Sequence, residues 1–444
     1  MKKQTVKLNR RIIFYSLFGL ILVLVFVKYA LQIGFPETGF LVLIAAAACL
    51  GTRDEIIAMG ISLIPLQTAF HIHIATIILV AVYVFKFSST IKINHRIISI
   101  ALMVIWELLH CFSGEFSLVT FAGNFAPYLL LGILMWTESQ KYDYEFITRC
   151  FAISTLAVGI MLLGKIGFAS GFSLEAIMLN MQRLGIGEKD VESVRGIINP
   201  NTLGIICVLA VSGLLQIFIA KKKRISDVVL IITLLIIGAL TISRTYLVLV
   251  AIMAVLFIMA QKRSLKSKIK IILGIAIIII ITLFLLSFVF PNVLKMFVYR
   301  FSLDNIVSGR DELLVAYNEF LLSDIKNMWF GVGLQDFSYK LMVQNRVAGN
   351  APHNGIQEII VAWGIPGFIF FMMFIFDLIA SSRKVNRHQK LLNFIPFILI
   401  FAKIQAGQII TSGYTLLTLA YCYLSLCHDF YPDENDAKIG IPDK

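Results

Sequence analysis

The stretch IILGIAIIIIITLFLLSFVF, residues 271–290, decides the fold class of this chain. It is twenty residues long and contains no charged side chain. A helix needs about 20 predominantly apolar residues to cross the hydrocarbon core of a bilayer. We therefore predict a transmembrane helix here, and the rest of the chain contains many similar runs.

The composition as a whole agrees with a chain that crosses the membrane many times. Of its 444 residues, 59% are hydrophobic and 15% are charged, and the mean hydropathy is +0.87. Soluble domains average about 45–50% apolar and about 25% charged residues. We predict an all-α polytopic membrane protein with about 12–14 transmembrane helices, in which residues 1–444 form a single integral membrane domain. The predicted spans are 12–33, 37–50, 56–71, 72–86, 97–112, 116–136, 146–168, 201–220, 225–242, 246–260, 271–290, 354–380, 391–410 and 414–428.

The distribution of basic residues predicts the orientation of these spans. The formal net charge is +13, and most of the 39 Lys and Arg residues lie in short blocks between apolar runs. Cytoplasmic loops of membrane proteins carry such an excess of Lys and Arg. We therefore place both termini in the cytoplasm, and we assign the basic charge to the anionic membrane surface rather than to nucleic acid.

Two connections are much longer than the others and face outward in this topology, at about 169–200 and about 291–353. Long connections within compact proteins are usually functional or disordered. In the second loop, Ser308 precedes Asp311 by three residues, which is typical of a helix start. Apolar residues at helical spacing follow and predict an amphipathic helix on the surface of the membrane domain. These residues are Leu313, Leu314, Tyr317, Phe320 and Leu321.

Two arginines in outward segments are candidate anion-binding residues. Arg310 lies in the first turn of the loop helix, where the helix dipole disfavours a cation unless an anion is shared with the free N–H groups. Arg244 lies in a very short connection between two spans, at the depth of the lipid headgroups. Because a guanidinium binds phosphate oxygens bidentately, both residues suit a lipid diphosphate. The alternatives are a solvated surface arginine at 310 and, at 244, a side chain that extends to the membrane interface.

Further polar residues mark the outward ends of spans. His353 precedes the span at 354–380 and is a candidate general base, the alternative being an interfacial histidine. Trp-Gly-Ile-Pro-Gly at 363–367 predicts a kink inside that span. Lys403 lies in the outer half of its span, where a charge usually faces a cavity. Asn-Pro-Asn at 199–201 is a turn and helix-capping signal.

Two other groups of residues receive no functional assignment. Glu107 and His110 lie one helical turn apart near the outer end of their span. His71 and His73 have no carboxylate or cysteine near them in sequence, so no metal site is predicted there. The six cysteines show no CxxC spacing, which argues against a metal knuckle or a disulfide framework.

Taken together, these motifs resemble the O-antigen polymerase/ligase family of bacterial envelopes. The resemblance covers about residues 195–380, and the matching elements follow the order of the family. The family often has a proline shortly before a Gly-x-Gly element, and this chain has none there. The matching elements are Asn-Pro-Asn at 199–201, Ser-Arg at 243–244, Gly-Arg at 309–310, Gly-x-Gly at 331–333, and His-Asn at 353–354 followed by Gly364 and Gly367.

The resemblance implies a metal-independent, inverting glycosyltransferase of the membrane, with no cofactor, that uses sugars carried on polyprenyl diphosphate. Its implied product is capsular, exo- or O-antigen polysaccharide, polymerised from lipid-linked repeat units on the outer side of the bacterial cytoplasmic membrane. Arg244 and Arg310 would bind the diphosphate, and His353 would accept the proton of the acceptor hydroxyl. The secondary candidates are Arg195, Lys403, Asn354 and Asn201.

Other activities remain as alternatives. An O-antigen ligase or a protein O-oligosaccharyltransferase would use the same donor, and the sequence leaves this choice open. A flippase or transporter is disfavoured, because its charges would be spread through the middles of many spans, and here they concentrate in outer loops. The expected partners are the lipid-linked donor and acceptor and the bilayer, with a chain-length regulator left open and nucleic acid excluded.

Overall fold

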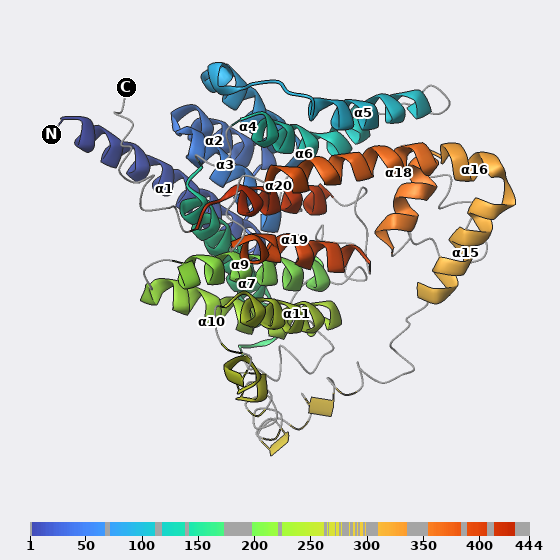
Figure 1. The fold of residues 1–444 in the computed structure, drawn as a ribbon. Coiled ribbons are helices and arrows are strands. Elements are labelled where there is room, and N and C mark those ends of the chain that lie inside the picture. The colour runs from blue at the N-terminus through green and yellow to red at the C-terminus, as the bar shows by residue number, and fades with distance from the viewer. Residues whose placement is uncertain are drawn as a thin grey trace.

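The computed structural model is a bundle of helices (Figure 1). It describes residues 2–66, 72–111, 118–137, 142–172, 198–220, 224–261, 310–334, 354–382, 389–405 and 413–430, with scattered positions between 264 and 298. Within these ranges there is no β-strand. The described elements are α1 (Lys2–Tyr29), α2 (Glu37–Leu50), α3 (Arg53–Ser62), η1 (Ile64–Leu66), α4 (Ile72–Phe87), η2 (Ser88–Thr90), α5 (Ile97–Cys111), α6 (Leu118–Trp136), α7 (Tyr144–Ser170), α9 (Pro200–Ala220), α10 (Ile225–Leu240), α11 (Arg244–Ala260), α15 (Arg310–Ser323), α16 (Ile325–Phe330), α18 (Gly355–Ser381), α19 (Lys390–Ile404) and α20 (Gly413–Cys427).

Apolar helices make up most of the bundle, as the sequence predicts. Five described helices are long and apolar enough to cross a membrane, namely α1, α4, α7, α9 and α18. Six shorter helices, α2, α5, α6, α10, α11 and α20, are also apolar. The protein is therefore an all-α polytopic membrane protein. Most of the span predicted at 271–290 and most of the loop predicted at 169–200 lie outside the described residues, and the positions of the span that are described are helical.

One predicted span, at 56–71, is wrong as a single helix. Helix α3 ends at Ser62, and a short 3-10 turn containing Pro65 follows it. Proline has no N–H for the next helical hydrogen bond, which favours the end of the α-helix at this position. The ten residues of α3 extend only about 15 Å, and all of them from Glu55 onward are buried. Its hydropathy therefore reflects burial inside the protein, which composition alone does not distinguish from contact with lipid.

Polar contacts gather many helix ends at one end of the bundle, named here the Asp143 end. The Arg11 guanidinium lies 3.5 Å from the Asp143 carboxylate. The neighbouring Tyr142 hydroxyl lies 2.7 Å from the Tyr83 hydroxyl and 2.8 Å from Thr137 Oγ1. These contacts join the first part of α1, the last turns of α4, the end of α6 and the start of α7.

A buried amide extends the Asp143 end to three further helices. Gln216, near the end of α9, donates from Nε2 to the Leu392 carbonyl (2.6 Å) and to Ser425 Oγ (2.9 Å). The Tyr144 hydroxyl donates to Oε1 of Gln216 at 2.6 Å. Because Gln216 is completely buried, each of these partners satisfies a group that would otherwise be costly to desolvate. The starts of α7 and α19 and the ends of α9 and α20 therefore lie together.

Two further contacts to carboxylate side chains lie at the Asp143 end. Arg149 of α7 donates from Nε and Nη2 to the two carboxylate oxygens of Asp227, both at 3.1 Å, near the start of α10. Ser99 Oγ, near the start of α5, donates to Asp377 Oδ2 at 2.8 Å, in the last part of α18. It follows that the starts of α9, α11 and α18 and the ends of α5, α10 and α19 lie at the opposite end, named here the Arg244 end.

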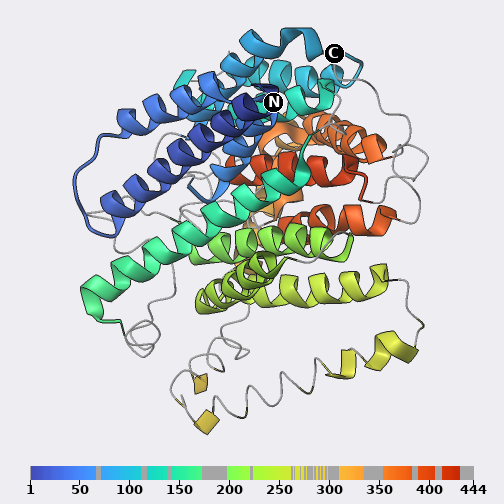
Figure 2. The ribbon, with the colours of Figure 1, turned by 90° about the vertical axis from the view of Figure 1, so that its left-hand side faces the viewer.

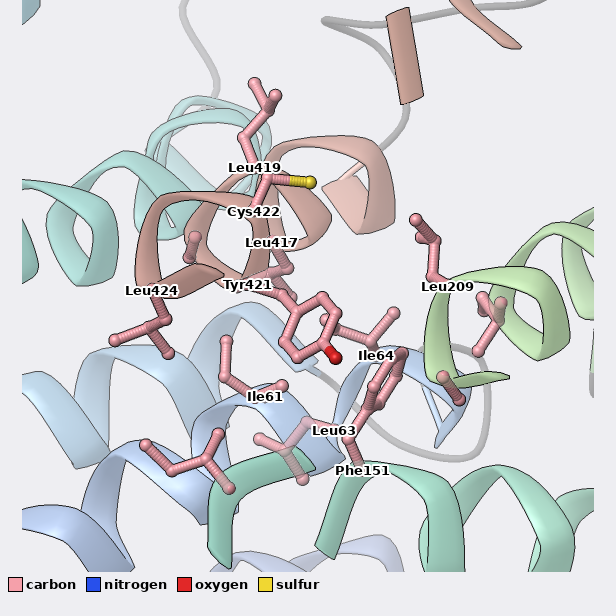
Figure 3. Packing of buried hydrophobic residues seen from close by; sticks show 14 of the residues in the cluster. Ile61, Leu63, Ile64, Phe151, Leu209, Leu417, Leu419, Tyr421, Cys422 and Leu424 are labelled. Atoms are coloured by element: carbon pink, nitrogen blue, oxygen red, sulfur yellow. The ribbon is translucent and has the colours of Figure 1, made fainter. Parts of the chain in front are cut away.

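The core between the two ends is apolar and aromatic. Tyr421 of α20 is fully buried, and its ring centroid lies 4.9 Å from that of Phe151 in α7. Figure 3 shows the two rings among Ile61, Ile64 and Leu209, which come from α3, η1 and α9. The Tyr421 hydroxyl is hydrogen-bonded to the Tyr144 hydroxyl at 3.1 Å, which satisfies the polar tip of a large buried side chain.

The helices of the second long loop, α15 and α16, lie at the edge of the bundle away from both chain termini (Figure 1). They pack against α18, and α19 and α20 lie between α18 and the layer of α9, α10 and α11 (Figures 1 and 2). The helix predicted to begin near Ser308 is confirmed, since α15 begins at Arg310.

Candidate active site

The corner between α10 and α11 carries the first predicted anion-binding residue. Thr241, Ile242 and Ser243 form the connection, and Ile242 takes a positive φ of 48°. Ser243 is buried and caps α11, because its hydroxyl accepts the N–H of Tyr246 at 3.3 Å. This tight corner makes Arg244 the first residue of α11, with a half-buried side chain at the Arg244 end.

The Asn-Pro-Asn element lies next to this corner. Asn199 Oδ1 accepts the N–H of Asn201 at 2.8 Å, and α9 begins at Pro200, the helix position where the missing N–H of proline costs nothing. One turn later, Gly204 allows α9 to approach the corner. A Cβ at Gly204 would lie 2.9 Å from Cβ of Tyr246, closer than real contacts allow. The structure therefore brings the predicted residues Asn201 and Arg244 to neighbouring helix starts.

Lys403 supplies a second cation at the Arg244 end. It lies in the last turn of α19, which packs against α11, and its side chain is only 4% exposed. Its ammonium group donates to Thr415 Oγ1, at the start of α20, at 2.9 Å. A charge inside the membrane domain is costly unless it is paired or faces a polar cavity, so this burial fits the sequence prediction of an inward-facing lysine.

Helix α15 carries the second predicted anion-binding residue at its first position. Arg310 begins the helix, and its side chain lies outside the described part of the structure. Leu313, Tyr317 and Leu321 are buried against Val361 of α18, as the predicted amphipathic helix requires. The prediction is wrong for one position: Leu314 is 43% exposed, because it lies about 100° around the helix from Leu313.

The start of α18 is tied directly to α15. Asn354 caps α18, since its Oδ1 accepts the N–H groups of Ile356 (3.0 Å) and Gln357 (3.2 Å). Gln357 donates from Nε2 to the Leu314 carbonyl (3.0 Å) and to Asn318 Oδ1 (2.9 Å). Gln357 and Leu314 each lie within about one helical turn of the first residue of their helix, and Asn318 lies about two turns into α15. The first turns of α15 and α18, and with them the backbone of Arg310, are thus held close together.

Two predicted residues cannot be placed. His353, which directly precedes the Asn354 cap, lies outside the described residues, and so does Arg195. The capping geometry at Asn354 is described, so the position at which the chain enters α18 is known. Among the described residues, no group of three or more His, Cys, Asp or Glu side chains could hold a metal ion.

The predicted kink in α18 is confirmed and explains the Gly-x-Gly element. Gly364 takes a positive φ of 65°, and Pro366 has no N–H to donate to the carbonyl of Ala362. The N–H of Gly333 donates to that carbonyl instead, at 2.7 Å. The N–H of Val332 donates to the carbonyl of the preceding residue in α18 at 3.1 Å. The segment 331–334 therefore supplies donors that the kinked helix lacks.

A buried carboxylate of α5 holds this segment in place. Glu107 is completely buried and accepts the N–H of Leu334 on both oxygens, at 3.0 and 3.1 Å, and the indole N–H of Trp363 at 2.8 Å. The indole N–H of Trp106 donates to the Trp363 carbonyl at 2.7 Å. His110 Nε2 donates to the Phe330 carbonyl at 2.6 Å. We call Trp106, Glu107 and His110 the α5 clamp, because they join α5 to both α16 and α18.

No functional role was predicted for Glu107, His110 or Glu358 from the sequence. Glu358 is 1% exposed and lies in the first turn of α18. Burial and the negative charge of Glu358 raise the pKa of Tyr317, on the facing side of α15, to about 12. A carboxylate within an otherwise apolar helix is the local signal that would have singled out both glutamates.

Comparison with known families found a match, which covers part of the candidate site. Residues 228–372 match a family model described as O-antigen ligase. This segment is therefore similar to the O-antigen polymerase/ligase family. The O-antigen ligase segment runs from α10 into α18, so it contains Arg244, Arg310, the segment 331–334 and the kink at Gly364. No curated protein matches the chain.

Proposed function

We propose that the protein is an integral-membrane glycosyltransferase that polymerises oligosaccharide repeat units carried on polyprenyl diphosphate. The observation that carries the proposal is the arrangement of three helix starts at the Arg244 end. Those of α15 and α18 are joined through Gln357, and that of α11 bears Arg244. The family to which residues 228–372 are similar works on lipid-linked oligosaccharides in a membrane.

The proposed reaction transfers the glycan to a hydroxyl with inversion. The acceptor oxygen forms a bond to the anomeric carbon of the donor while the bond from that carbon to the diphosphate oxygen breaks. Arg244 and Arg310 bind the diphosphate and stabilise the negative charge that develops as it leaves, without a metal ion. His353 accepts the proton of the attacking hydroxyl, a role that histidine side chains often have in general base catalysis.

The secondary candidates have supporting roles in this proposal. Asn354 fixes the chain directly after His353, because its side chain caps α18. Lys403 and Asn201 lie at the same end as Arg244 and contribute polar groups for the donor or the growing glycan. Arg195 remains a candidate anion-binding residue from the sequence alone.

The distribution of charge supports a location in the bacterial cytoplasmic membrane with the Arg244 end on the outer face. In the sequence, basic residues concentrate in the segments between apolar runs that we predict to be cytoplasmic loops. The product would be a capsular, exo- or O-antigen polysaccharide, and a chain-length regulator is a candidate partner. An O-antigen ligase or protein O-oligosaccharyltransferase is the second candidate, because the family description names a ligase.

Three variants and a control test this proposal in the native host. Arg244→Ala and Arg310→Ala should each reduce transfer by about 30- to 1000-fold, which corresponds to about 2–4 kcal/mol of lost transition-state stabilisation. His353→Gln keeps a polar side chain but no base, and should accumulate single-repeat lipid-linked glycan. Arg224→Ala, at the exposed cap of α10 at the Asp143 end, is the control and should leave chain length unchanged.

The readout is the ladder of lipid-linked glycan, with the amount of membrane protein measured in parallel. Long polymer from the Arg310→Ala strain at normal protein levels would contradict the diphosphate role. Normal lipid-linked polymer that is no longer attached to its final acceptor, in a strain lacking the protein, would show a ligase instead.

A further inference from the structure

Helices α15 and α16 expose an unusual amount of apolar surface for segments outside the predicted spans. Six of their apolar side chains are between 43% and 78% exposed, and Leu322 is the most exposed of them. Single exposed apolar residues are common, but several on two consecutive short helices indicate a surface that contacts something apolar. We call this set the apolar edge: Leu314, Val315, Leu322, Ile325, Trp329 and Phe330.

The surface of α15 is divided into strips with different chemistry. Leu313 and Tyr317 lie on the strip that is buried against α18. Val315 and Leu322 are seven residues apart, so they lie above one another on an exposed apolar strip. The exposed residues Glu312 and Glu319, also seven apart, form an acidic strip beside it. A helix with one strip in protein, one apolar and one acidic suits a position at the boundary between membrane and water.

The apolar edge continues a surface that already faces lipid. Phe330 stacks on Trp106 of α5, with ring centroids 6.3 Å apart and an interplanar angle of 16°. Ile105 and Leu109, on the adjoining strip of α5, are 53% and 54% exposed. Exposed Ile and Leu side chains on an apolar helix of a membrane protein contact acyl chains. Phe330 therefore extends the lipid-facing strip of α5 beyond the end of that helix.

The residues around the edge are those of a membrane interface. Trp329 is 47% exposed, and tryptophan is enriched where the headgroups meet the acyl chains. Lys326 is exposed on the same short helix, and its flexible stem can cover apolar surface while its charge reaches the headgroups. A soluble protein partner would have to cover the apolar edge without covering the adjoining lipid-facing strip of α5. A bilayer covers the apolar edge and that strip together.

We infer that the apolar edge lies in the bilayer leaflet at the Arg244 end, in contact with the acyl chains and headgroups of bulk phospholipid. Helices α15 and α16 are thus interfacial helices, and the second long loop is folded onto the membrane. This contact would hold Arg310, the first residue of α15, at headgroup depth, where it could bind a lipid diphosphate. That consequence rests on the proposed function, whereas the lipid contact itself does not.

Nitroxide labels at single cysteines test the contact. The full-length protein carries Cys49→Ser and Cys111→Ser, because its four other cysteines are buried, and is reconstituted into phosphatidylglycerol-containing nanodiscs without donor lipid. Labels at Leu322→Cys and Phe330→Cys report on the apolar edge. Labels at Glu312→Cys and Glu319→Cys, on the acidic strip of the same loop helices, are the matched controls.

The measurement compares collisions with oxygen, which partitions into lipid, and with a water-soluble nickel chelate. The ratio of oxygen to nickel accessibility should be several-fold higher at 322 and 330 than at 312 and 319. Equal ratios at all four positions would overturn the inference, and so would protection of 322 and 330 from both reagents, which would show that protein covers the edge. All four side chains are exposed, and the packing contact that is lost is the stack of Phe330 on Trp106, so an unchanged gel-filtration profile is needed to confirm folding. Loss of transfer activity would bear on the proposed function and leave this outcome unaffected.

Discussion

Replacing Glu107 tests whether the α5 clamp holds the segment 331–334 on α18. The Glu107 carboxylate is completely buried and accepts two donors, the N–H of Leu334 and the indole N–H of Trp363. Glutamine at this position has one acceptor oxygen, and its NH₂ group would face one of the two donors. Leucine has no acceptor, so it would leave both donors buried without a partner.

The expected magnitudes follow from these contacts. A hydrogen bond to a charged group contributes about 1.5–3 kcal/mol. Glu107→Gln forfeits one such bond, which should shift the docking equilibrium of the segment by about 10- to 150-fold. Glu107→Leu strands two buried donors and should cost about 3–6 kcal/mol, a large part of the typical 5–15 kcal/mol that stabilises a folded protein. Detachment of the segment costs less than unfolding α18, so we expect local opening first.

Hydrogen exchange in nanodiscs measures this opening directly. The amides of Val332, Gly333 and Leu334 donate hydrogen bonds in the intact structure and should exchange faster in Glu107→Gln and faster still in Glu107→Leu. Glu312→Gln, at an exposed position of α15, is the control and should exchange like the native protein. Native exchange rates at these three amides in the Glu107→Leu protein would refute the reasoning, because the carboxylate would then contribute nothing to docking.

Two further changes follow from the same region. Gly364→Ala would place a Cβ against the Trp329 carbonyl oxygen at a φ of +65°, so the thermal unfolding temperature of this variant should fall. Gly34→Ala is the control, because no atom lies within 4 Å of the added carbon, and it should match the native protein. Equal temperatures for all three proteins would count against the close approach of α16 to α18. The pKa of Tyr317 is raised to about 12 by burial and Glu358, so its contribution to stability is complete below about pH 10, the unfolded value, and is lost as pH rises through 12. Tyr317→Phe should therefore lose less stability than the native protein in denaturation series between pH 9 and pH 12, and parallel losses would contradict the buried position of the hydroxyl.

Local patterns in the sequence predicted most of the helices of this protein. Apolar runs of sufficient length gave the positions of α1, α7, α9 and α18, because a membrane helix must be apolar along its whole length. The start of α15 at Arg310 followed from its capping pattern, and the kink at Gly364 followed from glycine and proline within an apolar run. These signals are local, so they need no knowledge of neighbouring helices.

The contacts between distant segments could not be predicted in the same way. Glu107 and Leu334 are separated by 227 residues, and no pattern near either one indicates the other. The mistake at α3 has a related cause, since a buried helix and a lipid-facing helix have the same hydropathy. For the candidate site, the sequence supplied Arg244 and Arg310, but the joining of α15 to α18 through Gln357 required the three-dimensional structure.

The dependence of α18 on the Gly-x-Gly segment has a consequence for the biogenesis of the protein. A carbonyl without a donor costs several kcal/mol in hydrocarbon, and the carbonyls of Val361 and Ala362 find their donors in a segment that the ribosome makes before α18. When α18 leaves the translocon, the residues that complete it have already been synthesised and can bind at once. In a circular permutant that begins at α18, the helix would enter the bilayer with two carbonyls that have no hydrogen-bond donor. The order of the segments along the native chain therefore favours correct insertion.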